Sequence, residues 1–173
     1  MKKSFLQVLF TMVLIVLCGL GNLSAQTWQL VTDATQLAAG DQVVIAALDS
    51  NYAMSTDQRN TNRGAIAITK NENELIINDD VQIFTLVAGT EENTFGFYTG
   101  EGYIYAASSS GNQLKTQDEL TANSSFQITI DNTGDAFIQA QGNYTRNVIK
   151  FNYNSGNPIF SCYASTSSQK QVS

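Results

Sequence analysis

The stretch FQITIDNTGDAFIQA, residues 126–140, decides the fold class of this chain. From Phe126 to Ile130, apolar and polar side chains alternate, which is the period of a β-strand with one buried face. The segment Asp131–Gly134 consists of residues that favour tight turns, and a second β-rich run, Asp135–Gln141, follows it. The stretch therefore predicts a β-hairpin.

Runs of the same kind fill most of the chain. They are rich in β-branched and aromatic residues, and clusters of Gly, Asn, Asp and Ser separate them. No long segment after the N-terminal region has helical periodicity. The sequence therefore predicts an all-β fold, with further strands at Gln42–Ala47, Val81–Val87, Thr94–Tyr98, Gly102–Ala107, Asn147–Asn152 and Ile159–Tyr163.

A pattern of aromatic, polar and aliphatic residues recurs along the chain. It occurs in Trp28-Gln29-Leu30, Phe84-Thr85-Leu86 and Phe126-Gln127-Ile128, whose first residues are 56 and 42 positions apart. A repeat of about 40 to 55 residues, each of about four strands, indicates a repeat-built β architecture. We therefore predict a β-trefoil-like closed barrel of three four-strand units, because closure removes exposed sheet edges. A β-sandwich or jelly roll is the alternative, since strand number does not distinguish the two.

The N-terminus has the features of a signal peptide. Lys2 and Lys3 give a positive start, Phe5–Leu20 is mostly apolar, and Ala25 offers a small residue before a cleavage site. A retained membrane anchor is the alternative, but the run is short for a full span. We expect a signal peptide at residues 1–25, and a single module at residues 26–173 without a membrane span. This predicts a secreted protein, or one at the cell surface or in the periplasm.

Cys18, at the end of the apolar run, raises the alternative of a lipoprotein. Bacterial lipoprotein signals carry a small residue just before the cysteine, where this chain has Leu17. We therefore expect no lipid on Cys18.

The charge of the chain argues against nucleic acid as a partner. Nine Lys and Arg stand against 15 Asp and Glu, for a net charge of −6. Loss of Lys2 and Lys3 with the signal peptide changes the net charge to −8. Nucleic-acid-binding proteins need a basic face that neutralises phosphates.

The sequence also argues against an enzyme. It contains no histidine, which excludes Ser-His-Asp and Cys-His arrangements. Cys162 has no disulfide partner once Cys18 is removed, and we expect it to be a buried thiol. The acidic pairs Asp79-Asp80 and Glu91-Glu92 lie in polar connectors, where solvated charges are expected rather than the two carboxylates of a glycosidase.

No metal or cofactor is expected. Without histidine and with one mature cysteine, the chain has no ligand set for a transition metal. The loop Asp131–Asp135 offers oxygen atoms to calcium, but its position in a hairpin turn explains its composition.

Six stretches are shared with a known module: LAAGDQVVI (37–45), YAMS (52–55), NRG (62–64), GYIYAA (102–107), TRN (145–147) and FSCY (160–163). Through them the chain from Trp28 to Ser173 resembles a secreted, β-trefoil-like module of Bacteroidota extracellular proteins, which occurs alone or beside hydrolases and nucleases. The module has no agreed activity. Similar modules continue into a last strand, so we expect this chain either to end in a very short strand or to be a fragment that lacks it.

Polar and aromatic loops provide the candidate ligand-binding residues. Tyrosine rings pack on the apolar side of a sugar, while Asn and Arg bind its hydroxyls. Turn formation, and arginines that pin loops through backbone carbonyls, are the alternative explanation. The candidate residues are Tyr144, Arg146, Asn147, Tyr153, Asn60 and Arg63.

These observations predict a non-catalytic secreted binding module for carbohydrate, with a glycan or surface polysaccharide as its partner. The alternative is an accessory or structural domain of a larger secreted hydrolase or nuclease, truncated at the C-terminus. A protein-interaction or inhibitor module that uses the same loops is a third interpretation.

Overall fold

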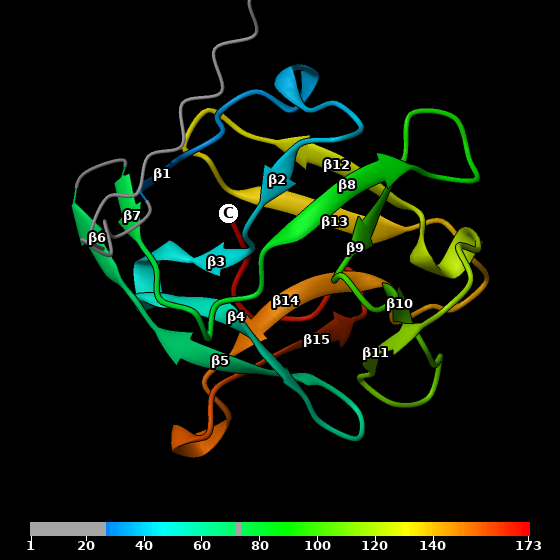
Figure 1. Ribbon diagram of the computed structural model, residues 1–173. Coiled ribbons are helices and arrows are strands. Elements are labelled where there is room, and N and C mark those ends of the chain that lie inside the picture. The colour runs from blue at the N-terminus through cyan, green and yellow to red at the C-terminus, as the bar shows by residue number, and fades with distance from the viewer. Residues whose placement is uncertain (1–26, 72–73) are drawn as a thin grey trace, which may run out of the picture.

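The computed structural model describes residues 27–71 and 74–173 (Figure 1). The predicted signal peptide at residues 1–25, with Cys18, lies outside these ranges. Among the described residues, none forms a helix long and apolar enough to cross a membrane.

Short strands and tight turns make up the described chain. The strands are β1 (Thr27–Gln29), β2 (Gln42–Val43), β3 (Ala46–Ala47), β4 (Tyr52–Gln58), β5 (Arg63–Ala67), β6 (Thr69–Asn71), β7 (Glu74–Ile76), β8 (Phe84–Ala88), β9 (Phe95–Tyr98), β10 (Tyr103–Ala106), β11 (Leu114–Gln117), β12 (Phe126–Ile130), β13 (Ala136–Ala140), β14 (Val148–Asn152) and β15 (Ile159–Tyr163). The helical turns are all of the 3-10 type: η1 (Ala34–Gln36), η2 (Leu48–Ser50), η3 (Ala122–Ser124) and η4 (Asn154–Gly156).

The hairpin predicted at residues 126–140 is confirmed. β12 pairs antiparallel with β13 along its whole length. In the turn between them, the Asp131 carboxylate accepts hydrogen bonds from the backbone N–H of Thr133 (2.8 Å) and of Asp135 (3.1 Å). The hydroxyl and then the N–H of Thr133 lower the pKa of Asp131, because both stabilise the charged carboxylate. The acidic side chain at position 131 therefore closes the turn.

Leu30, just after β1, packs against this turn at Gly134. The backbone of Gly134 is left-handed, with φ of 89°, and a Cβ atom there would lie 2.6 Å from the Cδ2 atom of Leu30. Glycine at this position therefore permits both the turn and the close approach of Leu30.

The strands form two antiparallel sheets. The larger sheet has the order β11-β10-β9-β12-β13-β14-β15-β5-β4-β3, and β8 pairs with both β9 and β2. The smaller sheet has the order β1-β7-β6. The prediction of an all-β fold is thus confirmed. The strand order of the described residues does not return on itself, so the three-unit barrel stays a prediction, and the two-sheet alternative also fits.

Residues 170–173, called the terminal segment below, join strands that are distant in sequence. The segment begins beside β14 and ends near β3 (Figure 1). The N–H of Ala136 in β13 donates to the carbonyl of Val172 (2.6 Å). Ala46 in β3 and Ser173 exchange two backbone hydrogen bonds, of 3.0 and 2.7 Å. The terminal segment therefore lies between β13 and β3.

The main hydrophobic core is dominated by phenylalanine rings. Phe84, Phe97 and Phe126 are buried, and their rings meet edge to face at centroid distances of 5.6 and 5.5 Å. Each buried ring contributes about 1.5–3 kcal/mol by leaving water, and each edge contact adds about 0.5–1.5 kcal/mol. Val172 is fully buried in the same core, which anchors the terminal segment.

The run from residue 43 to residue 47 sends its side chains alternately to two sides. Ile45 and Ala47 lie in the main core. Ala46 lies in a second cluster, and Val44 packs against that cluster. This alternation is the period of an extended strand. The second cluster lies beside β1 and β7 and contains Ala46, Ala53, Leu75 and Val81.

Candidate functional site

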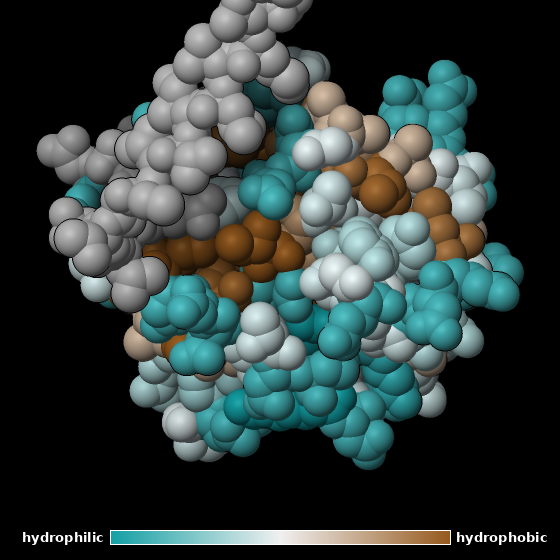
Figure 2. All heavy atoms as spheres, viewed as in Figure 1, coloured by the Kyte–Doolittle hydropathy of each residue, from teal (hydrophilic) through white to brown (hydrophobic). Residues whose placement is uncertain are grey.

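An apolar pocket of about 110 Å³, called the outer pocket below, lies beside the terminal segment. Figure 2 shows hydrophobic surface gathered over the part of the molecule where Figure 1 places β2, β3 and the C-terminus. The apolar side chains that line the pocket include Trp28, Val43, Val44, Leu48, Leu75 and Ile130.

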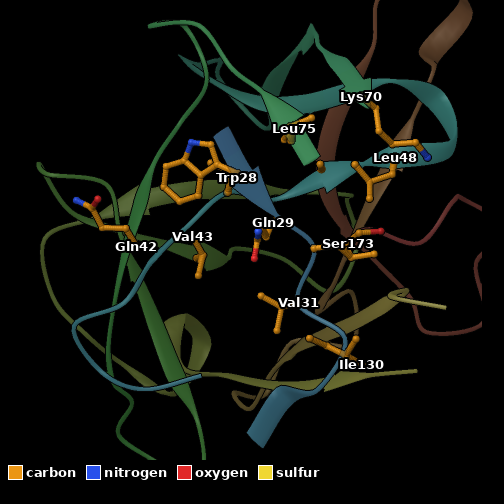
Figure 3. Close-up of a pocket in the computed structure, with 13 residues that line it drawn as sticks. Trp28, Gln29, Val31, Gln42, Val43, Leu48, Lys70, Leu75, Ile130 and Ser173 are labelled. Atoms are coloured by element: carbon orange, nitrogen blue, oxygen red, sulfur yellow. The ribbon is translucent and has the colours of Figure 1, made fainter. Parts of the chain in front are cut away.

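The smaller sheet positions one wall of the outer pocket. Trp28 of β1 lies directly opposite Leu75 of β7 in the antiparallel register. In Figure 3 these two side chains stand on one side of the pocket, while Val31 and Ile130 stand on the opposite side. Ser173 lies at a third side, so the end of the terminal segment reaches the pocket.

Trp28 has an unusual polar environment. Its ring is half-buried, and its indole Nε1 atom is buried without a hydrogen-bond partner among the described residues. A buried N–H group without an acceptor costs about 1–3 kcal/mol. A ligand that supplied an oxygen atom would therefore gain from this position.

A second cavity of about 50 Å³, called the inner pocket below, lies on the core side of the same region. Core residues such as Ile45, Phe97 and Ile138 line it. The two cavities share five lining residues: Val31, Val43, Val44, Ile130 and Ser173. They therefore lie on the two sides of one gap.

The lining of the outer pocket is mainly apolar. Lys70 is the one charged side chain among its lining residues, and Gln29 and Gln42 add amide groups. The lining contains no carboxylate side chain and no thiol. The pocket is suited to removing an apolar group from water.

The predicted residues Tyr144, Arg146 and Asn147 lie on one loop. Arg146 donates from Nε to the carbonyl of Ser109 (3.2 Å) and from Nη1 to the side chain of Asn112. Asn147 donates from Nδ2 to the carbonyl of Ala140, at the end of β13 (2.9 Å). Both polar side chains therefore hold the loop in place.

Tyr153 and Asn60 belong to a different part of the surface. Tyr153 is 57 % exposed and meets the Tyr52 ring edge to face at a centroid distance of 6.2 Å. Arg59, next to exposed Asn60, donates from Nη1 to Asn157 Oδ1 (3.0 Å), which joins the two loops. The contacts thus divide the surface candidates into two groups.

Arg63 faces the interior, with 3 % of its surface exposed. It donates from Nη1 to Gln82 Oε1 (2.9 Å) and from Nη2 to the Thr116 hydroxyl (2.9 Å). Burial lowers its pKa to about 10, against an opposing effect of Glu101 and Asp57. The guanidinium group therefore serves contacts within the fold.

Cys162 is fully buried, as expected for a structural thiol. Burial raises its pKa, because the thiolate would have to lose its hydration. Among the described residues, no cluster of His, Cys, Asp or Glu is placed to hold a metal ion.

Sequence reasoning missed the outer pocket. Its walls come from segments around residues 28, 44, 75 and 130, and no local pattern connects them. Trp28 was informative only as a member of the recurring pattern. The nearest signal was Val172, the apolar residue of the terminal segment.

Comparisons with known proteins identify a shared fold. No family model and no curated protein matches the sequence. A solved structure of the cytolethal distending toxin of Haemophilus ducreyi matches 76% of this chain and 78% of that chain, with 11% identity and a TM-score of 0.52. A structure of the cytolethal distending toxin from Actinobacillus actinomycetemcomitans matches 76% of this chain and 88% of that chain, with 12% identity and a TM-score of 0.54. At these identities the likeness concerns the fold alone.

This finding corrects the function predicted from the sequence. The prediction of a non-catalytic carbohydrate-binding module, with an accessory domain of a hydrolase or nuclease as its alternative, is wrong, because the matched chains come from toxins. The resemblance to a Bacteroidota module stays a prediction. What the comparisons identify is an all-β chain with the fold of cytolethal distending toxin chains.

Proposed function

We propose that this chain is the partner-binding component of a toxin-like protein assembly, and that it binds a polypeptide through the outer pocket. The observation that carries the proposal is the concave apolar lining around Trp28, whose buried indole N–H has no acceptor. Aromatic anchors in desolvated pockets supply much of the binding energy of protein interfaces. The likeness to cytolethal distending toxin chains supports the toxin-like class.

The size of the outer pocket favours a polypeptide over a small molecule. Pockets for drug-sized ligands have volumes of about 300–1,000 Å³. The outer pocket, at about 110 Å³, has room for one apolar side chain. A polypeptide can place one side chain there and find its remaining contacts on the surrounding surface.

A β-trefoil-like barrel is part of the proposal. Its support is a series of pairings: β2 with β8, β8 with β9, β9 with β12, and β12 with β13. The terminal segment bonds to β13 on one side and to β3, which follows β2 in the chain, on the other. With β2 and β3 taken as one continuous strand, this series would close into a barrel. The outer pocket then lies at the seam that the terminal segment makes.

The proposed component is exported and is not an enzyme. The charged start, apolar run and small residue at Ala25 support export. The lack of histidine in the sequence and the apolar lining of the outer pocket support a role in binding.

Site-specific crosslinking in the host of origin tests the proposal. Gln42 is exposed and lines the outer pocket, so benzoylphenylalanine in its place reaches a molecule bound there. We expect a discrete crosslink to another polypeptide, which is identified by mass spectrometry and whose binding is then measured with the purified partner. Leu48→Asp, which places a charge in the pocket lining, should weaken that binding at least about tenfold.

The matched control carries benzoylphenylalanine at Ser110, an exposed residue of another loop that does not line the pocket. Thermal unfolding checks that every variant is folded. Equal crosslinking from positions 42 and 110, or binding that is insensitive to Leu48→Asp in a folded protein, contradicts the proposed function.

A further inference from the structure

The outer face of β8, β9 and β10 carries apolar and aromatic side chains that belong to neither hydrophobic cluster. Thr85 lies opposite Tyr98, and Tyr98 lies opposite Tyr103, so these three side chains form a row across the strands. Beside this row, Val87 lies opposite Gly96. The side chains that alternate with them along the strands point into the main core. Val87, Tyr98 and Tyr103 are half-buried, and they pack with neither cluster.

A leucine from a neighbouring segment completes this surface. We call it the tyrosine face; it consists of Val87, Tyr98, Tyr103 and Leu120. Half-buried Leu120 lies over Gly96, where a Cβ atom would be 2.5 Å from Leu120 Cδ1. The Tyr98 hydroxyl donates to the carbonyl of Gly100 (2.7 Å), and the rings of Tyr98 and Tyr103 have a centroid distance of 5.2 Å. The rings are therefore fixed by contacts within the fold, which lowers the entropic cost of binding on them.

Five exposed carboxylates border the tyrosine face. They are Glu91 and Glu92 in the β8–β9 turn, Glu101 in the β9–β10 turn, and Asp118 and Glu119 directly before Leu120. Figure 2 shows hydrophilic surface where Figure 1 places the β8–β9 turn. The one salt bridge among the described residues lies elsewhere, so none of these five carboxylates has a cation of this chain at salt-bridge distance. Their negative charge is available to a partner.

The charge around the tyrosine face belongs to a larger asymmetry of the sequence. Between Lys70 and Arg146 the chain has 11 Asp and Glu residues and a single basic residue, Lys115. Lys115 lies opposite Tyr105, two positions beyond Tyr103 on β10. A surface with one sign of charge attracts molecules of the opposite sign and repels those of the same sign. This face therefore disfavours nucleic acids and anionic lipids and favours a cationic partner.

We propose that the tyrosine face binds an arginine-rich polypeptide segment. The bordering carboxylates pair with guanidinium groups, and the tyrosine rings stack on their planes. Arginine suits this face better than lysine, because its planar group stacks on aromatic rings and binds a carboxylate through two hydrogen bonds. Val87 and Leu120 offer contacts to apolar side chains of the segment, which a polyamine lacks. This second interaction surface is separate from the outer pocket and does not depend on the proposed function.

A synthetic peptide tests the inference. The probe is acetylated and amidated Arg-Leu-Arg-Ala-Arg-Leu-Arg, titrated into the ¹⁵N-labelled protein at about 50 mM salt, where screening is weak. We expect the largest changes in amide chemical shift at Gly96, Tyr98, Tyr103 and Leu120. The control peptide has lysine in place of every arginine, which keeps the charge and the apolar side chains. It should bind at least about threefold more weakly, because its ammonium groups do not stack in the same way.

Two double variants with the same change in net charge locate the binding. Glu101→Gln with Glu119→Gln removes two carboxylates that border the tyrosine face, and it should weaken binding of the arginine peptide at least about fivefold. Asp79→Asn with Asp80→Asn is the matched control, because these exposed residues lie in the connector before β8. It should change the affinity less than about twofold. Thermal unfolding checks that both variants are folded.

Each alternative has its own outcome. Equal weakening by the two double variants would show that overall charge governs binding, and it overturns the inference. Equal affinity for the arginine and lysine peptides overturns the choice of arginine, and equal affinity for spermine overturns a polypeptide occupant. Leu48→Asp, in the lining of the outer pocket, should leave binding of the arginine peptide unchanged. Loss of binding in that variant would place the peptide in the outer pocket, which overturns the second surface while leaving the proposed function standing.

Discussion

Arg63 and Gln82 are both buried and are joined by a hydrogen bond of 2.9 Å from Nη1 to Oε1. The amide of Gln82 in turn donates to the carbonyls of Ile83 (2.7 Å) and Thr99 (3.2 Å). The pair therefore connects β5 to the backbone on both sides of β8 and β9. Arg63 Nη1 and Nη2 and the Gln82 amide are hydrogen-bonded, whereas Arg63 Nε is buried without a partner among the described residues, so burial of the guanidinium group keeps part of its cost.

Removal of the Arg63 side chain should destabilise the protein strongly. Arg63→Met leaves Gln82 Oε1 and the Thr116 hydroxyl without their donor, and each unsatisfied group costs about 1–3 kcal/mol. We expect the free energy of unfolding to fall by about 3 kcal/mol in urea denaturation. The matched control is Arg59→Met, at an arginine on the surface paired with exposed Asp57, which should cost at most about 1 kcal/mol. Equal losses in the two variants would contradict the structural role of Arg63.

The turn at Gly134 should not tolerate a side chain. Gly134→Ala forces a residue with a Cβ atom into a left-handed φ of 89° and places that atom 2.6 Å from Leu30. Strain and overpacking together should cost about 2–4 kcal/mol. Gly40→Ala is the control, because φ there is 101° but no atom lies within 4 Å of the added Cβ. Thermal unfolding should rank Gly134→Ala clearly below Gly40→Ala, and the reverse order would refute the packing argument.

Asp131 should stabilise the hairpin in a pH-dependent way. Its pKa is lower in the folded protein than its ordinary value of 3.8, because Thr133 binds the carboxylate. The stabilisation is therefore present above pH 3.8 and is lost as the pH falls through the lowered pKa. We expect wild type to melt above Asp131→Asn at pH 6, with the difference shrinking as the pH falls below 3.8. A difference that does not change between pH 6 and pH 2 would show that the charge is not its source.

Cys162 should be unreactive in the folded protein. It is fully buried, and burial raises its pKa, so the nucleophilic thiolate is scarce. We expect no labelling of residue 162 by iodoacetamide at pH 8 in native buffer, and complete labelling in concentrated urea. Peptide mapping by mass spectrometry follows this residue alone. Rapid labelling without denaturant would mean that β15 opens locally.

The parts of the fold that the sequence predicts well are those in which the alternation of apolar and polar residues coincides with the pairing of the strands. Residues 126–140 alternate cleanly and contain a turn sequence, and they form the hairpin. The strand expected from Val81 instead starts at Phe84 as β8. Before it, the backbone N–H of Gln82 donates to the carbonyl of Met54, and Val81 pairs with Ser55. Val81 and Gln82 therefore pair with β4, and only this tertiary pairing determines where β8 begins.

The polar strand β6 was not predicted from the sequence for a related reason. β6 (Thr69–Asn71) is exposed along its length, so it has no buried face to produce alternation. Sequence composition singled out Arg63 and Arg146 as candidates, but it could not distinguish ligand binding from contacts within the fold. The outer pocket depends on Trp28 and Ile130 meeting in space, which no local window can report.

The bonds between Ala46 and Ser173 also bear on the order of folding. They join two segments that are far apart in the sequence, and such contacts form slowly because a long loop must close first. Until Ser173 is available, β3 and β13 lack their neighbour and the place of Val172 in the core is empty. Of the described residues, the terminal segment is synthesised last, so these contacts of β3 and β13 are completed late in folding.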